Sequence, residues 1–231
     1  QFSTPVNVAL SKRSIETWES FDDEFGIDIE FNQHGYLFLT ADQETADRLA
    51  DRVTMQQDLG VPSEFIPAEA ATEYLPELYA DSYVAAAYCP RDGSADPHLA
   101  LQAYSEAAVE AGADIRFKTT VTDIRRSGDE VTGVETDDGA FEADTVVNAA
   151  GAWAAQVATL ADIDIPVSPR RRQVVTIEPE IPYPETAPLT FDMDSAVYFA
   201  PDRDGEAMVG GHFADEDPEM DPDRYSTSFD M

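Results

Sequence analysis

The stretch that most constrains the fold of this chain is residues 144–172, which read DTVVNAAGAWAAQVATLADIDIPVSPRRR. Its apolar start at 145–147 is typical of a buried strand. Small residues follow at 148–151, and a helical pattern runs over 153–161. Because small residues at a strand-to-helix turn let a bulky ligand approach the backbone closely, this stretch predicts one wall of a ligand site.

The charge of the chain is strongly negative. Among 231 residues, 47 are acidic and 14 are basic, which gives a formal net charge of −33. Acidity spread along a chain with regular apolar periodicity predicts a folded protein with a solvated surface, as halophiles use, and it argues against an acidic disordered protein. We therefore expect a halophilic cytoplasm as the setting. The length allows one large domain or two small ones.

Several classes of partner and site are disfavoured. Nucleic acid and anionic membranes carry the same sign of charge as the chain, so neither is an expected partner. No apolar run has the length of a membrane span and no signal peptide is visible, so membrane insertion is not expected. Cys89 is the single cysteine, and His34, His98 and His212 are widely separated, so no metal site is predicted. Because the chain starts at Gln1 and ends abruptly, we expect a processed chain or a fragment.

The first 90 residues predict helices and strands of a mixed domain. The predicted elements are a helix over 11–25 closed by Gly26, a β-hairpin over 27–39, a helix after Asp42, and a strand over 83–89. Asp42 is the expected N-cap of its helix, whose buried face would carry Ala46, Leu49, Val53 and Gln56.

The character of the chain changes at Pro90. Asp96 is the expected N-cap of a helix with Pro97 in its first turn, and Leu101, Tyr104, Ala108 and Ala111 are its expected face. The elements expected after it are strands over 115–118, 121–125, 130–136 and 140–143, and later a hairpin of 196–200 with 207–210. This order indicates an α/β arrangement with an antiparallel flap.

Familiar active-site motifs are absent from the sequence, which contains no GxGxxG, P-loop, HExxH or G-x-S-x-G. Two weaker features remain. The cluster at 170–172 is basic, and strand alternation would turn Arg171 away from its two neighbours, so surface ion pairing and a substrate role are both open. His212 follows two glycines at a strand end, where an imidazole can be structural or can face a ligand.

Together, several segments resemble a known family. VTGVETDDGAFEADTVVNAAGAWA, EAGADIRFKTTVTDI, HGYLFLT and the Asp96-Pro97 helix are similar to FAD-dependent amine oxidoreductases, the family of D-amino-acid oxidase, glycine oxidase and sarcosine oxidase. The resemblance covers nearly the whole chain, yet only the middle of the family's chain. The N-terminal GxGxxG turn that holds the FAD pyrophosphate is missing, as is the C-terminal glycine-rich segment. The resemblance therefore implies a central fragment that is inactive in isolation.

The resemblance implies a cofactor, FAD, and the residues beside it. Val121 matches the strand position whose backbone meets the adenine. Ala149, Ala150 and Gly151 match the turn that passes the diphosphate, and Trp153 follows in the same motif.

It also implies substrate-facing residues. Tyr198 and His212 match a tyrosine and a histidine of the hairpin over the substrate. Independently of the resemblance, Arg171 would bind the substrate carboxylate if it faces inward. No residue is assigned a catalytic role.

The expected fold is α/β (α+β), with a partial FAD-binding domain interleaved with a substrate domain on a mixed or antiparallel sheet. Residues 91–165 would belong to the FAD-binding domain, residues 9–90 and 166–213 to the substrate domain, and 214–231 to an acidic tail.

The expected function is oxidation of a secondary amine or amino acid, such as sarcosine, glycine or dimethylglycine, by hydride transfer to flavin. Two alternatives remain: a non-catalytic, salt-adapted scaffold domain, and a flavin oxidoreductase for a 2-hydroxy acid or glycerol 3-phosphate. The partners expected are the small-molecule substrate and an electron acceptor or partner subunit.

Overall fold

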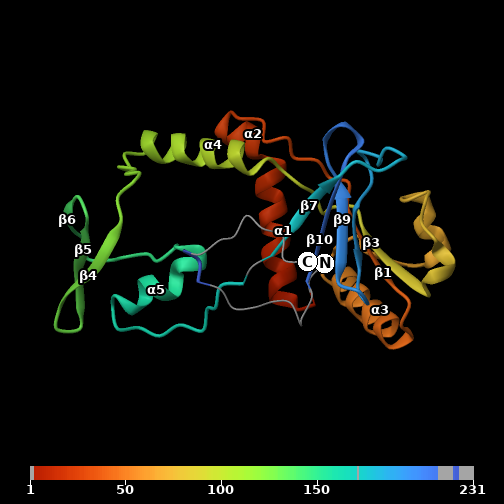
Figure 1. Cartoon of the computed structure of the whole chain (residues 1–231), viewed down its shortest axis with the longest axis horizontal. Coiled ribbons are helices and arrows are strands. Elements are labelled where there is room, and N and C mark those ends of the chain that lie inside the picture. The colour runs from red at the N-terminus through yellow and green to blue at the C-terminus, as the bar shows by residue number, and fades with distance from the viewer. Residues whose placement is uncertain (1–2, 171, 213–220, 224–231) are drawn as a thin grey trace. The chain divides into compact units, whose positions relative to one another are not determined.

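The computed structural model describes residues 3–170, 172–212 and 221–223 (Figure 1). The chain divides into two compact units. The first comprises Gln1–Ala113 and Gln173–Phe213, and the second comprises Asp114–Arg172 and Ala214–Met231. The domain boundaries expected from the sequence stay a prediction.

A seven-stranded sheet forms the centre of the first unit (Figure 1). Its order is β2-β3-β1-β8-β9-β10-β7. The strands are β1 (Tyr36–Thr40), β2 (Glu64–Pro67), β3 (Ala85–Cys89), β7 (Val174–Ile177), β8 (Leu189–Asp192), β9 (Val197–Pro201) and β10 (Ala207–Gly211). β1 and β8 pair in parallel, and the other pairs are antiparallel. The expected mixed sheet is thus confirmed.

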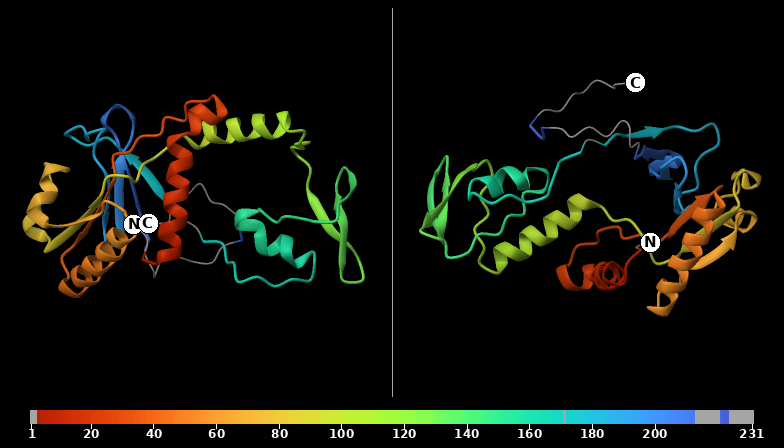
Figure 2. Two further views of the ribbon diagram at one scale, coloured as in Figure 1. Left: turned by 180° about the vertical axis from the view of Figure 1, so that it is seen from behind. Right: turned by 90° about the horizontal axis from the view of Figure 1, so that it is seen from below.

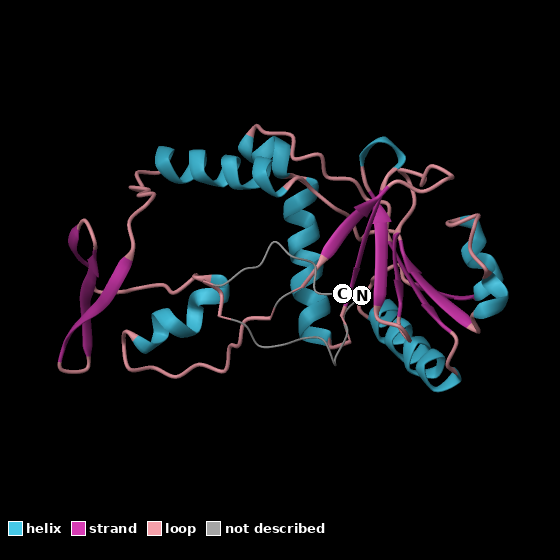
Figure 3. Cartoon of the chain, in the orientation of Figure 1, coloured by secondary structure: helices cyan, strands magenta, loops and turns pink. Residues whose placement is uncertain are grey.

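Helices α3 (Gln43–Asp58) and η1 (a 3₁₀ helix, Ala68–Glu73) pack against this sheet, and the other helices of the first unit lie around its edges or lead away from it (Figure 3). These others are α1 (Pro5–Glu19), α2 (Phe21–Phe25), α4 (Pro97–Glu110) and the 3₁₀ helices η2 (Ala80–Ser82) and η4 (Arg203–Gly205). Successive side chains of β1 point to opposite faces of the sheet, as in any β-strand. Leu37 and Leu39 pack with Ala71 of η1 on one face, whereas Phe38 packs against Leu49 and Val53 of α3 on the other.

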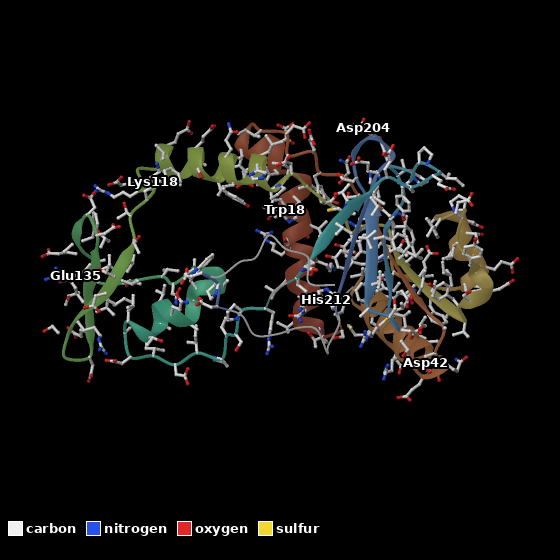
Figure 4. The ribbon with its side chains drawn as sticks, in the orientation of Figure 1. Trp18, Asp42, Lys118, Glu135, Asp204 and His212 are labelled. Atoms are coloured by element: carbon white, nitrogen blue, oxygen red, sulfur yellow. The ribbon has the colours of Figure 1, made fainter. Side chains whose placement is uncertain are left out.

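Both the N-cap residue and the buried face predicted for α3 are confirmed. Asp42, labelled in Figure 4, accepts a hydrogen bond from the Thr45 backbone N–H at 2.7 Å. The four residues predicted to face inward are all buried: Ala46, Leu49, Val53 and Gln56. The helix lies along one face of the sheet (Figure 2), because this apolar stripe needs the sheet to cover it.

Two predictions for the N-terminal region were wrong. The first helix begins at Pro5 rather than at residue 11, because Pro5 occupies the first helical turn, where a missing N–H costs nothing. The hairpin over 27–39 does not form: β1 pairs with β3 and β8, and Asn32 makes a single bridge to Ser94. Local alternation could not reveal that the partners of β1 are distant in sequence.

Helix α4 has the predicted cap but a different buried face. The Asp96 Oδ1 atom accepts hydrogen bonds from the backbone N–H groups of His98 and Leu99 at 2.8 and 3.1 Å. Ala100 and Ala103 are buried beside Phe21, whereas Leu101 is 65 % exposed. Tyr104 of the predicted face does contact Phe21 edge-on, with ring centroids 5.1 Å apart, but the prediction for Leu101 was wrong, because the bulky ring of Phe21 fits against small alanines that a hydrophobicity pattern ranks below leucine.

The second unit holds a three-stranded antiparallel sheet, the predicted flap. It comprises β4 (Val121–Ser127), β5 (Glu130–Thr136) and β6 (Gly139–Glu142), and the short helices η3 (Gly151–Trp153) and α5 (Ala154–Thr159) follow. Figure 4 labels Lys118 before β4 and Glu135 in β5.

The strands predicted at 115–118 and 145–147 do not form. Residues 117–118 form a turn and the rest of both segments has no regular secondary structure, with Phe117 80 % and Val147 84 % exposed. A strand needs hydrogen-bonding partners on a neighbouring strand, and no segment among the described residues pairs with either of them.

Candidate functional site

Aromatic side chains gather on one face of the large sheet in the first unit. Phe38 of β1 is in register with Phe191 of β8, and Phe191 is in register with Tyr198 of β9. Residues paired in register project from the same face, so these rings line up across three strands. We call the aromatic surface the set Tyr36, Phe38, Phe191, Tyr198 and His212, in which neighbouring ring centroids lie 5.8 to 6.4 Å apart.

Tyr198 and His212, the two predicted substrate-facing residues, come together on this surface. Their ring centroids are 5.8 Å apart, and the phenol ring of Tyr198 lies nearly parallel to that of Phe191, at 9°. His212, labelled in Figure 4, is held at the end of β10 because its backbone N–H donates to the carbonyl of Ala196 at 3.0 Å. Their role toward a substrate stays a prediction.

A glycine makes room for the tyrosine ring. Gly210 is the register partner of Tyr198, and a Cβ atom added at Gly210 would lie 2.3 Å from the Tyr198 Oη and 2.4 Å from its Cζ. The phenol ring therefore lies across the neighbouring strand in a space that only glycine leaves open. The sequence analysis noted the glycines before His212, but it could not show that Gly210 makes room for the ring of Tyr198.

Polar groups border the aromatic surface at Tyr36. Burial raises the pKa of Tyr36, and the nearby Asp92 carboxylate and Tyr198 raise it further, so the phenol keeps its proton. Burial also raises the pKa of the Asp92 carboxyl group. Arg171, the predicted carboxylate ligand, lies outside the described residues.

The turn predicted to face the FAD diphosphate lies in the second unit and is held by Asn148. The Asn148 side chain accepts a hydrogen bond from the Ala150 N–H at 3.2 Å and donates one to the Ala154 carbonyl at 2.8 Å. Gly151 has φ of 54°, which favours glycine, and a Cβ atom there would meet no atom within 4 Å. The turn is thus fixed in shape while its outer side is open.

The two other residues predicted to contact the cofactor are Trp153, which follows this turn, and Val121, which begins β4. Trp153 is 45 % exposed, and its indole Nε1 donates to the Asp223 carboxylate at 2.8 Å. Val121 opens β4 and is 38 % exposed, and the Thr120 N–H before it donates to Asp137 at 2.9 Å.

The residues present fit one wall of a dinucleotide site. A small-residue turn with open space beside Gly151 and an exposed indole next to it can accept a flat or phosphorylated group at close range. The sequence signal was the N-A-A-G run, but Asn148, which shapes the turn, was not among the predicted site residues. The cofactor candidates lie in the second unit, whereas Tyr198 and His212 lie in the first.

Two further properties bear on the class of protein. Within the described residues, no three His, Cys, Asp or Glu side chains are arranged to hold a metal ion. The helices of that same part of the chain are too short or too polar to cross a bilayer.

Comparison with known proteins identifies relatives that match most of this chain. The chain is 29 % identical to mitochondrial dimethylglycine dehydrogenase of Rattus norvegicus over 195 residues, which is 83 % of this chain and 23 % of that protein. It is 30 % identical to glycine oxidase of Geobacillus kaustophilus over 91 % of this chain and 56 % of the oxidase. The chain therefore spans about half or less of the length of these relatives.

Solved structures give the same result for the fold. L-proline dehydrogenase from P. horikoshii is similar with a TM-score of 0.84 at 32 % identity, over 92 % of this chain and 57 % of that one. The expected α/β fold is confirmed by this similarity. A family model described as FAD dependent oxidoreductase matches residues 3–230. The chain belongs to this family of FAD-dependent amine and amino-acid oxidoreductases, as its sequence motifs predicted.

Proposed function

We propose that the protein oxidises a secondary amine or a small amino acid, of the sarcosine, glycine or dimethylglycine type. The observation that carries the proposal is the aromatic surface with Tyr198 and His212 side by side in a family of amine oxidoreductases. Ala149, Ala150 and Gly151 would hold FAD, which would supply the hydride acceptor for oxidation of the neutral amine to an imine that water then hydrolyses.

The chain's own residues would bind and orient the amine. The parallel rings of Phe191 and Tyr198 offer apolar contacts for methyl or methylene groups. The Tyr198 hydroxyl and the His212 imidazole add hydrogen-bonding groups, which can fix the polar end of the substrate. The turn at 148–151 would contact the cofactor.

We further propose that this chain is the central part of a longer enzyme and is inactive alone. The unpaired segments at 115–118 and 145–147, with exposed Phe117 and Val147, support this reading, because a neighbouring strand would both pair and cover them. The setting we propose is a salt-rich cytoplasm, supported by the formal net charge of −33.

Anaerobic reduction of the flavin absorbance tests the function in the product of the complete reading frame. We expect bleaching by sarcosine, dimethylglycine or glycine. His212→Ala and Tyr198→Phe should raise the substrate concentration needed, and Tyr79→Phe, which alters a tyrosine that is 84 % exposed, should not. Bleaching only by a 2-hydroxy acid or by glycerol 3-phosphate would establish the alternative substrates. A full-length protein that takes up no FAD would establish a scaffold.

A further inference from the structure

A cavity of about 360 Å³ lies in the first unit between α1, β1 and the loop before α4. Three aromatic side chains line it: Phe31, Tyr36 and Trp18, and Figure 4 labels Trp18 on α1. Two carboxylates, Asp92 and Asp96, also line it, and no lysine, arginine or histidine is among its lining residues in the described part of the chain. The cavity thus combines ring faces with negative charge only.

The loop that carries these carboxylates is tied down by backbone hydrogen bonds. The Gly35 N–H donates to the Asp92 carbonyl at 2.9 Å, and Asn32 and Ser94 exchange two hydrogen bonds at 2.9 and 3.0 Å. The contact is so close that a Cβ atom at Gly93 would lie 2.5 Å from the Asn32 carbonyl oxygen. The Asp92 side chain is therefore presented from a fixed backbone, which limits the entropy lost when it binds a ligand.

The two carboxylates differ in how they are used. Asp96 caps α4 through two backbone N–H groups, so its Oδ1 is already occupied. The Asp92 carboxylate has the Cys89 thiol as a hydrogen-bonding neighbour, but its buried oxygen Oδ2 meets no nitrogen or oxygen donor among the described residues. An acceptor buried without a donor is costly, and burial accordingly raises the pKa of this carboxyl group. A ligand that brings a positive N–H donor would relieve that cost.

We propose that this cavity is a binding site for a small organic ammonium cation, which Asp92 holds by a charge-assisted hydrogen bond and Trp18, Phe31 and Tyr36 surround with their rings. Aromatic faces attract alkylammonium groups through the ring quadrupole, and a carboxylate completes the charge balance. Anionic ligands are repelled by the same groups. The cavity shares Tyr36 with the aromatic surface, but binding there requires no flavin, so it can be tested on this chain separately from the proposed oxidation.

Trp18 supplies the readout. In a Trp153→Phe background, Trp18 is the single tryptophan, and its fluorescence is followed while dimethylammonium chloride replaces sodium chloride at constant ionic strength. We expect a saturable change, and we expect sodium acetate to give none. Asp92→Asn should weaken binding at least about tenfold, since it removes the charge that pairs with the ammonium group. Asp23→Asn removes an exposed charge on α2 and is the matched control, which should bind as the parent does.

Tyr36→Leu provides a second variant that keeps the carboxylate and removes one ring, and it too should weaken binding. Circular dichroism of each variant confirms that it is folded. Three results would overturn the proposal: no saturable fluorescence change with dimethylammonium, equal affinity in the folded Asp92→Asn and parent proteins, or competition by acetate.

Discussion

Replacing Gly210 with alanine tests whether the aromatic surface depends on one missing side chain. The added Cβ would lie 2.3 Å from the Tyr198 hydroxyl oxygen, closer than any van der Waals contact allows. Because β9 and β10 are fixed in register by their hydrogen bonds, the phenol ring has to leave the space across Gly210. It would then lose its contacts with Phe191 and His212.

The expected loss follows from those two contacts. Each aromatic pair contributes about 0.5 to 1.5 kcal/mol beyond its buried area, so two pairs contribute about 1 to 3 kcal/mol. Alanine in place of glycine in a strand stabilises by about 0.5 to 1 kcal/mol, because the unfolded chain has less freedom to lose. We therefore expect Gly210→Ala to lower the free energy of unfolding by about 0 to 2.5 kcal/mol in net terms, with a central value of about 1 kcal/mol.

A double-mutant cycle by denaturant unfolding separates the clash from the backbone effect. In a Tyr198→Ala background no ring remains to be displaced, so Gly210→Ala should be neutral or stabilising by up to about 1 kcal/mol. If Gly210→Ala costs the same with and without the tyrosine, the reasoning is wrong, and the glycine is needed for the backbone of β10 instead. Near-UV circular dichroism should change in the single variant, because the environment of Tyr198 changes.

Three further changes probe other parts of the molecule. Asp96→Ala should cost about 1 kcal/mol of stability in urea unfolding because it removes the cap of α4, and Asp96→Asn, which can still cap, should cost much less; equal losses would contradict the capping role. Burial raises the pKa of Tyr183 from 10.0 to about 12, so the stability that its protonated form contributes is complete below pH 10 and is lost as pH rises through 12. Tyr183→Phe should therefore gain up to about 2.7 kcal/mol relative to the parent across that window, as measured by urea unfolding at each pH, and a difference independent of pH would refute the assignment. Gly133→Ala should unfold the flap, because its Cβ would lie 2.0 Å from the Phe141 carbonyl oxygen, and loss of the β4–β6 amide protection in hydrogen exchange would show it; unchanged protection would count against the geometry of β5.

The sequence alone determined the elements whose signals are local. Asp42 and Asp96 stand at helix starts where their carboxylates cap free N–H groups, and the apolar spacing that follows Asp42 fixes which side of α3 is buried. The hairpin of β9 and β10 and the flap of β4 to β6 join neighbours in sequence, so turn residues were enough to predict them. The family motifs were equally local, and they predicted the FAD-dependent class.

Only the tertiary structure decided which distant segments meet. No strand was predicted at β8, yet it lies between β1 and β9 and joins the two halves of the large sheet. Its Phe191 brings the ring of Phe38 into line with Tyr198, and the cavity beside Tyr36 depends on the bridge between Asn32 and Ser94. Contacts between residues far apart in sequence cannot be predicted from periodicity. The apolar pattern of a segment indicates which of its faces is buried, but not which distant segment it contacts.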